Sequence, residues 1–283
     1  MSKPTVALLG TGTMGAGMAR TIAGAGLPLR VWNRTREKAE PLADVAEVAD
    51  SAADAVRGAD VVVTMLFDTD SVRSAMTEAR EGLGDGVVWL QQSTVGVEGT
   101  EELATLAEEL GLVYVDAPVL GTKKPAEDGA LVVLAAGPDS AREVAQPVFD
   151  AIGSRTLWVG EPGQATKLKL VANSWVLTVV EGIAEALTLA RSLGVEPEKF
   201  LEVVKGGAMD APYVQLKGSS MLAGDFTPSF GLAGAAKDAS LILDAARASG
   251  ADVEFVEVVQ QHFARALEAG HGDLDLSATY LAH

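Results

Sequence analysis

Short apolar runs recur through the first half of the chain and predict β-strands at Val6–Leu9, Leu29–Trp32, Asp60–Met65, Val87–Gln91, Leu112–Asp116 and Leu131–Ala135. Between several of these runs lie stretches rich in alanine and glutamate with helical spacing, such as Met14–Ala25 and Thr100–Leu110. Continuous apolar strands that alternate with helices are typical of a largely parallel sheet covered on both faces. The pattern therefore predicts a doubly wound α/β domain over residues 1–161.

A different pattern begins after about Gly163, where the runs typical of strands stop. Gln164–Leu193 predicts one long helix, and shorter helical stretches follow near 197–205, 233–248, 251–269 and 273–281. Gly206–Pro212 and Asp225–Phe230 carry the glycines and prolines of loops. We expect a long joining helix and an all-α domain over residues 162–283.

The long apolar stretch contains five polar or charged residues: Lys169, Asn173, Glu181, Glu185 and Arg191. A membrane span tolerates few such residues, so we expect a buried helix and no contact with a membrane. The chain has no cysteine, and its first residues do not have the pattern of a signal peptide, which predicts a cytoplasmic protein. The formal net charge of −17 argues against a nucleic-acid partner.

A glycine-rich loop follows the first predicted strand directly. It reads Gly10-Thr11-Gly12-Thr13-Met14-Gly15 and opens the next predicted helix. In this context the glycines permit a tight turn, close approach of a pyrophosphate, and close packing of helix on strand. The loop predicts a Rossmann-type dinucleotide site, with Gly10–Met14 as cofactor-binding residues.

The end of the second strand indicates which dinucleotide binds. NAD-selective sites place Asp or Glu there to bind the ribose 2′-hydroxyl. This chain has Asn33, Arg34 and Thr35 instead. A guanidinium pairs with a 2′-phosphate, so we assign all three residues to the cofactor and predict NADP(H).

With these motifs the sequence resembles the β-hydroxyacid dehydrogenase family over essentially its whole length. Besides the two cofactor motifs, the resemblance rests on the segment Asp116–Gly129, on Lys169 with Asn173, and on Phe230 with Lys237-Asp238. The segment Asp116–Gly129 is most similar to the version found in glyoxylate/succinic semialdehyde reductases. The family implies an oxidoreductase that reduces a small aldehyde or keto acid, or oxidises a β-hydroxy acid.

The resemblance implies roles for individual residues. Lys169 and Asn173 correspond to the catalytic pair, and their i, i+4 spacing places them on one helix face, roughly opposite Lys167. Lys169 is then the general acid that donates a proton to the developing alkoxide. The remaining assignments are Met65, Leu66, Thr94 and Lys237 to the cofactor, and Leu120, Gly121, Thr122, Trp175, Phe230 and Asp238 to the substrate.

Two departures from the family pattern concern the substrate and the nicotinamide end of the cofactor. Leu120 stands where relatives commonly have a serine that holds the substrate carboxylate, which makes the pocket more apolar. Gln91-Gln92 precedes Ser93-Thr94, where relatives often have an aspartate. Trp175 and Met209 are able to line a pocket, although a core role is at least as expected for each.

Two other functions stay open: reduction of imines, favoured by Leu120, and a non-catalytic NADP-binding module, disfavoured by the presence of Lys169. The histidines His262, His271 and His283 lie far from every motif, so we expect surface positions and neither a metal site nor a His–Asp proton relay. Exposing so much apolar helix is costly, which favours a homodimer or homotetramer.

Overall fold

A computed structural model describes residues 3–283 and divides the chain into two compact units: unit 1, up to Lys169, and unit 2, Leu170–His283. Unit 1 contains a six-stranded parallel sheet with the order β3-β2-β1-β4-β5-β6. Its strands are β1 (Val6–Leu9), β2 (Leu29–Trp32), β3 (Glu47–Val48), β4 (Val61–Thr64), β5 (Val88–Gln91) and β6 (Val113–Asp116). The strand order reverses between β1 and β4, as in a doubly wound fold.

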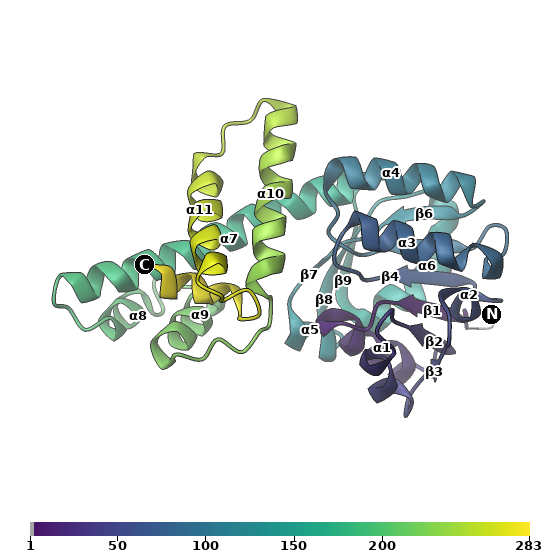
Figure 1. Ribbon diagram of the computed structural model, residues 1–283, viewed down its shortest axis with the longest axis horizontal. Coiled ribbons are helices and arrows are strands. Elements are labelled where there is room, and N and C mark those ends of the chain that lie inside the picture. The colour runs from purple at the N-terminus through teal and green to yellow at the C-terminus, as the bar shows by residue number, and fades with distance from the viewer. Residues whose placement is uncertain (1–2) are drawn as a thin grey trace. The chain divides into compact units, whose positions relative to one another are not determined.

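Helices cover both faces of this sheet (Figure 1). They are α1 (Thr13–Gly24), α2 (Ala52–Val56), α3 (Thr69–Ala79), α4 (Gly96–Glu109), α5 (Lys123–Glu127) and α6 (Asp139–Ile152), with 3₁₀ turns η1 (Arg36–Lys38), η2 (Glu40–Leu42) and η3 (Arg80–Gly82). Successive residues of a strand point to opposite faces, so Val6 and Leu8 join one core cluster, and Ala7 and Leu9 join the other. The first cluster includes residues of α1 and α6, and the second includes residues of α2, α3 and α4.

A second sheet of three strands departs from the prediction. It consists of β7 (Val119–Leu120), antiparallel to β8 (Leu131–Ala135), which in turn pairs in parallel with β9 (Gly153–Trp158). The predicted strand Leu131–Ala135 therefore exists but belongs to this sheet rather than to the main one. Strand β9 escaped prediction because its residues Gly153–Trp158 are exposed or only partly buried and form no continuous apolar run.

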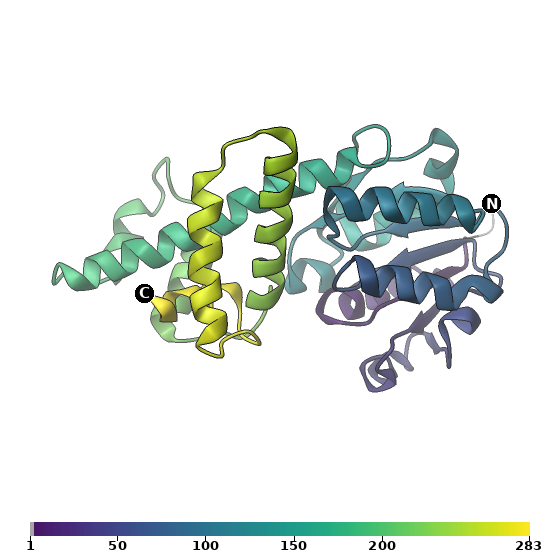
Figure 2. The ribbon, with the colours of Figure 1, turned by 45° about the horizontal axis from the view of Figure 1, so that its top comes forward.

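Unit 2 is built from helices. It contains most of α7 (Gln164–Ser192), followed by α8 (Glu198–Val204), α9 (Pro212–Ala223), α10 (Leu232–Ser249), α11 (Glu254–Glu268) and the 3₁₀ helix η4 (Leu276–Ala282). Helices α10 and α11 lie side by side (Figure 2). The helical stretch predicted near 273–281 is present as a 3₁₀ helix, which Asp275 caps by accepting a hydrogen bond from the Ser277 N–H.

Helix α7 is long and apolar enough to cross a membrane by length and composition alone, and 44% of its most apolar window is buried inside the chain. Glu181 in this helix is 4% exposed. The expected buried helix is only partly buried, because Val171, Trp175 and Leu189 are exposed.

Candidate active site

The glycines of the first loop have different surroundings. Gly10 adopts a φ of +105°, and a Cβ there would lie 2.3 Å from the carbonyl oxygen of Met65. A Cβ on Gly15 would lie 1.9 Å from the carbonyl oxygen of Gly10, whereas one on Gly12 would meet no atom within 4 Å. Gly10 and Gly15 therefore permit close packing of strand, loop and helix, and Gly12 keeps the loop surface clear for a ligand.

Helix α1 begins at Thr13 directly after this loop, and no side chain makes a capping hydrogen bond at its N-cap, Gly12. The N–H groups of its first turn, which includes Met14, are therefore available to an anion. Thr11 is 3% exposed, and its Oγ1 has no hydrogen-bond partner among residues 3–283. An uncapped helix start, a clear glycine surface and an unpaired buried hydroxyl fit the pyrophosphate of a dinucleotide.

Asn33, just beyond β2, fastens the loop to the second strand. Its Oδ1 accepts a hydrogen bond from the Thr11 N–H at 3.1 Å, and its Nδ2 donates to the Thr35 carbonyl at 2.9 Å. The side chain expected to bind cofactor therefore also holds the backbone that surrounds the site. Arg34 and Thr35 are exposed, and no hydrogen bond or ion pair engages the Arg34 guanidinium within the described chain.

The other cofactor candidates of unit 1 lie beyond the carboxyl ends of β4 and β5. Met65 and Leu66 follow β4, Thr94 lies three residues after β5, and all three are partly buried. The Leu66 N–H donates to Ser93 Oγ at 2.8 Å, and buried Gln91 holds Ser93 by accepting from its N–H at 2.7 Å. Ligands of doubly wound sheets bind at this edge, where the strand order reverses.

Lys169 is partly buried, and its Nζ donates a hydrogen bond to the Val119 carbonyl at 2.8 Å. Lys167, two residues earlier in α7, is exposed. Val119 lies three residues after the carboxyl end of β6 and immediately before Leu120. The Lys169 ammonium is thus held beside the segment expected to bind substrate.

Asp116, the first residue of the segment Asp116–Gly129, is a positioning residue to which the motif assigned no role of its own. It is fully buried at the end of β6 and accepts hydrogen bonds from the Gly163 and Thr166 N–H groups, both at 2.9 Å, and from Thr166 Oγ1 at 2.7 Å. Burial raises the pKa of the Asp116 carboxyl, and the hydrogen bonds from Thr166 and Gly163 oppose this only in part. These bonds fix the first turn of α7, one turn before Lys169. In the sequence, the only sign of this role was a charged residue directly after a run of apolar strand residues.

Leu120 belongs to β7 and has a packing role. It is partly buried and packs against a small cluster that includes Leu134, Ala136 and Ala165. Gly121 follows with a φ of +123°, and Thr122 precedes α5 without capping it through its side chain. The backbone and hydroxyl of Gly121 and Thr122 therefore remain available to a ligand, while part of the Leu120 side chain supports the start of α7.

In unit 2, three of the predicted residues form one polar chain. Asn173, 3% exposed, donates from Nδ2 to Asp238 Oδ2 at 2.6 Å, and Asp238 Oδ1 lies 2.9 Å from Lys237 Nζ. Asp238 is therefore already paired to a cation and an amide. The structure places it as the group that orients Asn173 and Lys237.

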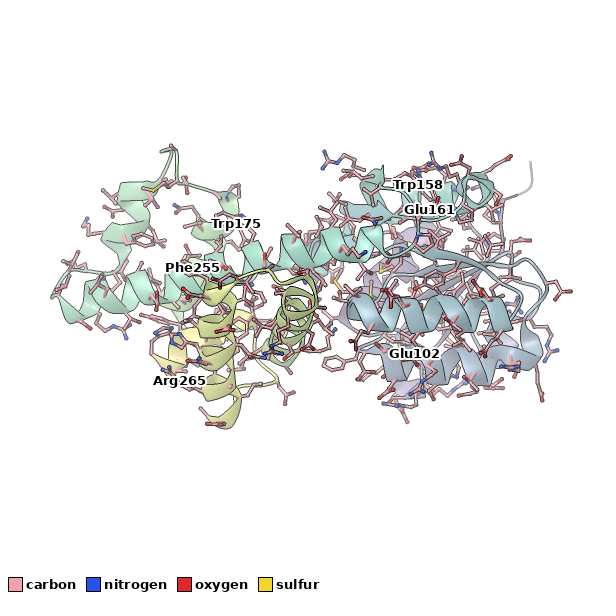
Figure 3. All side chains as sticks on the ribbon, turned by 90° about the horizontal axis from the view of Figure 1, so that it is seen from above. Glu102, Trp158, Glu161, Trp175, Phe255 and Arg265 are labelled. Carbon is pink, nitrogen blue, oxygen red and sulfur yellow. The ribbon has the colours of Figure 1, made fainter. Side chains whose placement is uncertain are left out.

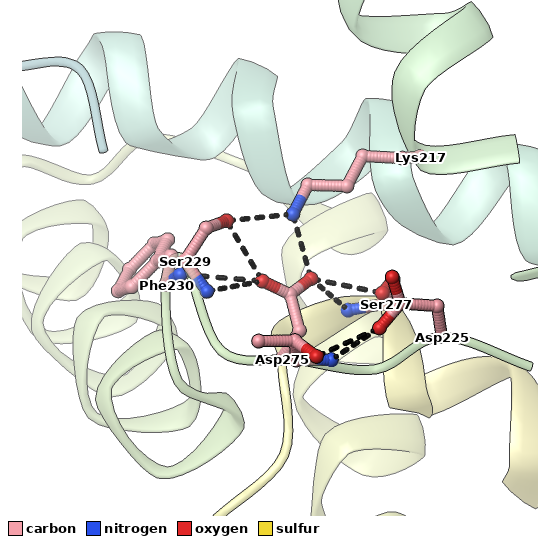
Figure 4. A network of polar contacts seen from close by, with 7 residues as sticks. Lys217, Asp225, Ser229, Phe230, Asp275 and Ser277 are labelled. Carbon is pink, nitrogen blue, oxygen red and sulfur yellow. Dashed lines mark hydrogen bonds and ion pairs between the residues drawn. The ribbon is translucent and has the colours of Figure 1, made fainter. Parts of the chain in front are cut away.

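Phe230 ends a loop that a buried ion pair holds in place. Asp275 lies 2.6 Å from Lys217 Nζ, and both are at most 4% exposed. The same carboxylate accepts hydrogen bonds from the N–H groups of Ser229 at 2.9 Å and Phe230 at 3.2 Å (Figure 4). Burial raises the pKa of Asp275, but the hydrogen bond and charge of Lys217 outweigh it and hold the pKa at about 2.

Trp175 does not join the Asn173–Asp238 pair, and a core role for it is wrong. It is 69% exposed and projects from α7 (Figure 3). Residues two apart in a helix point about 200° apart, so buried Asn173 and exposed Trp175 lie on different faces. Trp175 instead lines an apolar groove of about 410 Å³ together with Met209, which is 80% exposed.

The expectation of surface histidines holds only in part. His262 and His283 have side chains that are 12% and 11% exposed, and both contact buried Glu181. Sequence distance hid this cluster, because its three residues come from α7, from α11 and from beyond η4. His271 lies outside the cluster.

A parallel sheet with this strand order, a glycine loop at its carboxyl edge and a partly buried lysine beyond β6 define an NAD(P)-dependent oxidoreductase of the Rossmann type. Residues 5–160 match the family described as the NAD binding domain of 6-phosphogluconate dehydrogenase. Residues 163–282 match the family described as NAD-binding of NADP-dependent 3-hydroxyisobutyrate dehydrogenase. The chain belongs to the β-hydroxyacid dehydrogenase family.

Named relatives match nearly the full length of the chain. An uncharacterized oxidoreductase, YfjR, of Bacillus subtilis is 35% identical over 280 residues, which cover 96% of this chain and 97% of the relative. Glyoxylate/succinic semialdehyde reductase 1 of Arabidopsis thaliana is 32% identical over 277 residues, with 96% of each chain covered. The structure of Mycobacterium tuberculosis 3-hydroxyisobutyrate dehydrogenase with L-serine is 30% identical, with a TM-score of 0.88 and 99% of each chain covered.

Proposed function

We propose that this oxidoreductase uses NADPH to reduce a small aldehyde or keto acid of the glyoxylate or succinic semialdehyde type, or runs the reverse oxidation of a β-hydroxy acid, with Lys169 as the general acid. The observation that carries the proposal is the Lys169 ammonium, partly buried and 2.8 Å from the Val119 carbonyl beside Leu120-Gly121-Thr122. The similarity to glyoxylate/succinic semialdehyde reductases supports the substrate class.

The chemistry required of the chain is the handling of one proton and one negative charge. When bound, the nicotinamide cofactor supplies the hydride. Lys169 Nζ–H stabilises the negative charge on the substrate oxygen and gives it a proton, and in the reverse direction the neutral amine accepts that proton. The Val119 carbonyl orients the ammonium by accepting a hydrogen bond from one of its N–H groups at 2.8 Å.

The preference for NADP rests on the end of β2. Asn33 is engaged in backbone contacts, and the Arg34 guanidinium is exposed. No carboxylate occupies the end of this strand to bind a ribose 2′-hydroxyl, so a 2′-phosphate meets a planar cation without repulsion from an acidic neighbour in the motif.

The partly buried position of Leu120 weakens the argument for imine reduction. Its packing against the cluster of Leu134, Ala136 and Ala165 explains an apolar residue here without an apolar substrate. Gly121 and Thr122 keep hydrogen-bond donors for a carboxylate. A small acid is therefore compatible with the segment as it stands.

The deciding experiment is turnover of NADPH with a panel that contains glyoxylate, succinic semialdehyde and cyclic imines, using wild type, Lys169→Ala and Lys167→Ala. We expect reduction of the acids, a loss of kcat of about 10²–10⁴-fold for Lys169→Ala, and near wild-type kcat for Lys167→Ala. Turnover of the cyclic imines but not of the acids would show that the substrates are imines and not small aldehydes or keto acids. Cofactor binding without any turnover would indicate a non-catalytic module.

We also propose a homodimer or homotetramer, supported by the apolar surface of unit 2. Trp175, Met209 and Phe255 are 69%, 80% and 76% exposed, and Figure 3 shows Trp175 and Phe255 on α7 and α11. Large exposed apolar side chains that lie close together mark interfaces in soluble proteins. Light scattering of wild type and of Trp175→Asp tests this, since an interface aromatic replaced by a charge should shift the protein towards monomer.

A further inference from the structure

A cluster of metal-ligating side chains lies in unit 2, outside every motif used above. Glu181 of α7, His262 of α11 and His283 just beyond η4 each offer one ligand atom, and these atoms lie within 4.8 Å of one another. His283 Nε2 is 2.6 Å from Glu181 Oε1, and His262 Nδ1 is in hydrogen-bond contact with the same oxygen. Ring nitrogens from two histidines therefore converge on one carboxylate oxygen.

The carboxylate of Glu181 is expensive to bury unless positive charge or hydrogen-bond donors surround it. Glu181 is 4% exposed. Its Oε2 accepts a hydrogen bond from buried Thr279 Oγ1 at 2.8 Å, which leaves Oε1 to face the two imidazoles. A neutral imidazole donates only a hydrogen bond, whereas a divalent cation in the same place supplies the charge that a buried carboxylate needs.

We propose that Glu181, His262 and His283 bind a zinc ion. Two imidazole nitrogens and one carboxylate oxygen are a donor set that Zn²⁺ accepts, with a water molecule as fourth ligand. Thr279 plays the outer role that such sites require, because it fixes the free oxygen of the ligating carboxylate.

Tetrahedral binding of zinc requires a rearrangement of the three ligand atoms, which lie within 4.8 Å of one another. Zinc bonds of about 2.0–2.1 Å place tetrahedral ligand atoms about 3.3 Å apart. The His283–Glu181 separation of 2.6 Å must therefore open by less than about 1 Å. Each imidazole then carries its proton on the other ring nitrogen. The two histidine side chains remain 11–12% exposed, which leaves the ion a path from solvent.

The ion joins three parts of unit 2 that are far apart in the sequence. Glu181 and His262 lie on separate helices, and His283 fastens the segment that follows Leu276–Ala282. Metal binding to the folded state alone stabilises it, so zinc is a clamp on the C-terminal segment. None of these residues belongs to the proposed catalytic machinery.

The test uses the 283-residue chain without a histidine tag, stripped of metal and titrated with Zn²⁺ against a chromogenic chelator. We expect one zinc per chain by native mass spectrometry. At free zinc about 100 times Kd, the folding equilibrium constant of unit 2 should rise about 100-fold. His283→Gln, at the end of the chain, should weaken binding by more than about 100-fold, and Thr279→Val by about 10–100-fold.

His271→Gln is the matched control, because it removes a histidine of unit 2 outside the cluster and should leave zinc affinity unchanged. Circular dichroism identifies any variant that fails to fold, and the comparison of His283→Gln with His271→Gln keeps the test decisive if the double variant does not fold. Zinc affinity that is equal in wild type and the His262→Gln/His283→Gln double variant would overturn the proposal. An equal loss for His271→Gln and His283→Gln would overturn it as well.

Discussion

Replacement of Asp116 tests how the structure holds Lys169 in position. The Asp116 carboxylate accepts three hydrogen bonds from the start of α7, from the N–H groups of Gly163 and Thr166 and from the Thr166 hydroxyl. Lys169 follows Thr166 by three residues in the same helix. Asp116→Ala removes all three acceptor contacts, whereas Asp116→Asn keeps an oxygen and nearly the same volume.

The loss of folding stability in Asp116→Ala depends on which new acceptor each of the three hydrogen-bond donors can reach. The Gly163 N–H is only partly buried, so water replaces the lost acceptor. The Thr166 hydroxyl can turn to Thr100 Oγ1, which is 3.0 Å away. Thr166 itself is 2% exposed, so its N–H is left unsatisfied. One buried unpaired donor and two weakened hydrogen bonds should lower the free energy of unfolding by about 2–4 kcal/mol.

Asp116→Asn should lower the free energy of unfolding by about 1 kcal/mol or less. The oxygen of the new asparagine still accepts from the two N–H groups, and its NH₂ group donates to Thr166 Oγ1. The Thr166 hydroxyl then donates to Thr100, whose own hydroxyl already bonds the Gly96 carbonyl at 2.8 Å. Both changes should leave NADPH affinity nearly unaltered. Asp116→Ala should lower kcat roughly 10–100-fold, because the helix that carries Lys169 loses its anchor.

Urea unfolding measures the stability change, and tryptophan fluorescence reports mainly unit 1, since Trp32, Trp89 and Trp158 lie there. The pKa of Asp116 is raised, so its contribution to stability is full below the ordinary value of 3.8 and falls as the pH rises through the folded pKa. The cost of Asp116→Asn should therefore be smaller at pH 7 than at pH 4. Equal stability losses for the Ala and Asn variants would refute the hydrogen-bond account.

Three further outcomes are expected. Arg34→Ala should weaken NADPH binding far more than NADH binding, and a wild type that prefers NADH would contradict the interpretation of the second strand. Leu120→Ser should lower stability and leave kcat/KM for glyoxylate nearly unchanged, because Leu120 packs against buried residues while Gly121 and Thr122 keep donors for a carboxylate. A rise in kcat/KM of about 10–100-fold would show instead that the carboxylate lacks a hydroxyl donor. Asp275 has a depressed pKa of about 2, so wild type should be more stable than Asp275→Asn by about 2 kcal/mol above pH 4. This difference in the free energy of unfolding should disappear as the pH falls towards about 2, which urea unfolding across that range measures.

The elements with strong local patterns were predictable from sequence. The predicted positions are correct within a residue for helix α7 and for the strands Val6–Leu9 and Leu29–Trp32. The strands were predictable because burial on both faces of a parallel sheet requires apolar residues without interruption. Strand β9 and helix α9 (Pro212–Ala223) lack such a signal. The large apolar residues of α9 do not form one stripe, so their periodicity is weak; they are Tyr213, Val214, Leu216, Met221 and Leu222.

The site was predictable where one short segment carries the function, as in Gly10–Gly15. It was not predictable where residues act through partners distant in sequence. Asp116 and Thr166 are 50 residues apart, and Asn173 and Asp238 are 65 apart. A motif identifies that Asn173 and Asp238 matter, but only the fold shows that they bond to each other.

This distinction changes what the motif residues mean. The motif predicts that Asn33 binds the cofactor, yet its side-chain amide accepts a hydrogen bond from the Thr11 N–H and donates one to the Thr35 carbonyl. Asp238 was assigned to the substrate, yet both of its oxygens already have partners. A buried polar group keeps its position because leaving a donor or acceptor unpaired costs more than the bond contributes. Residues that hold others in place are therefore under the same chemical constraint as residues that touch a ligand, and a motif contains both kinds.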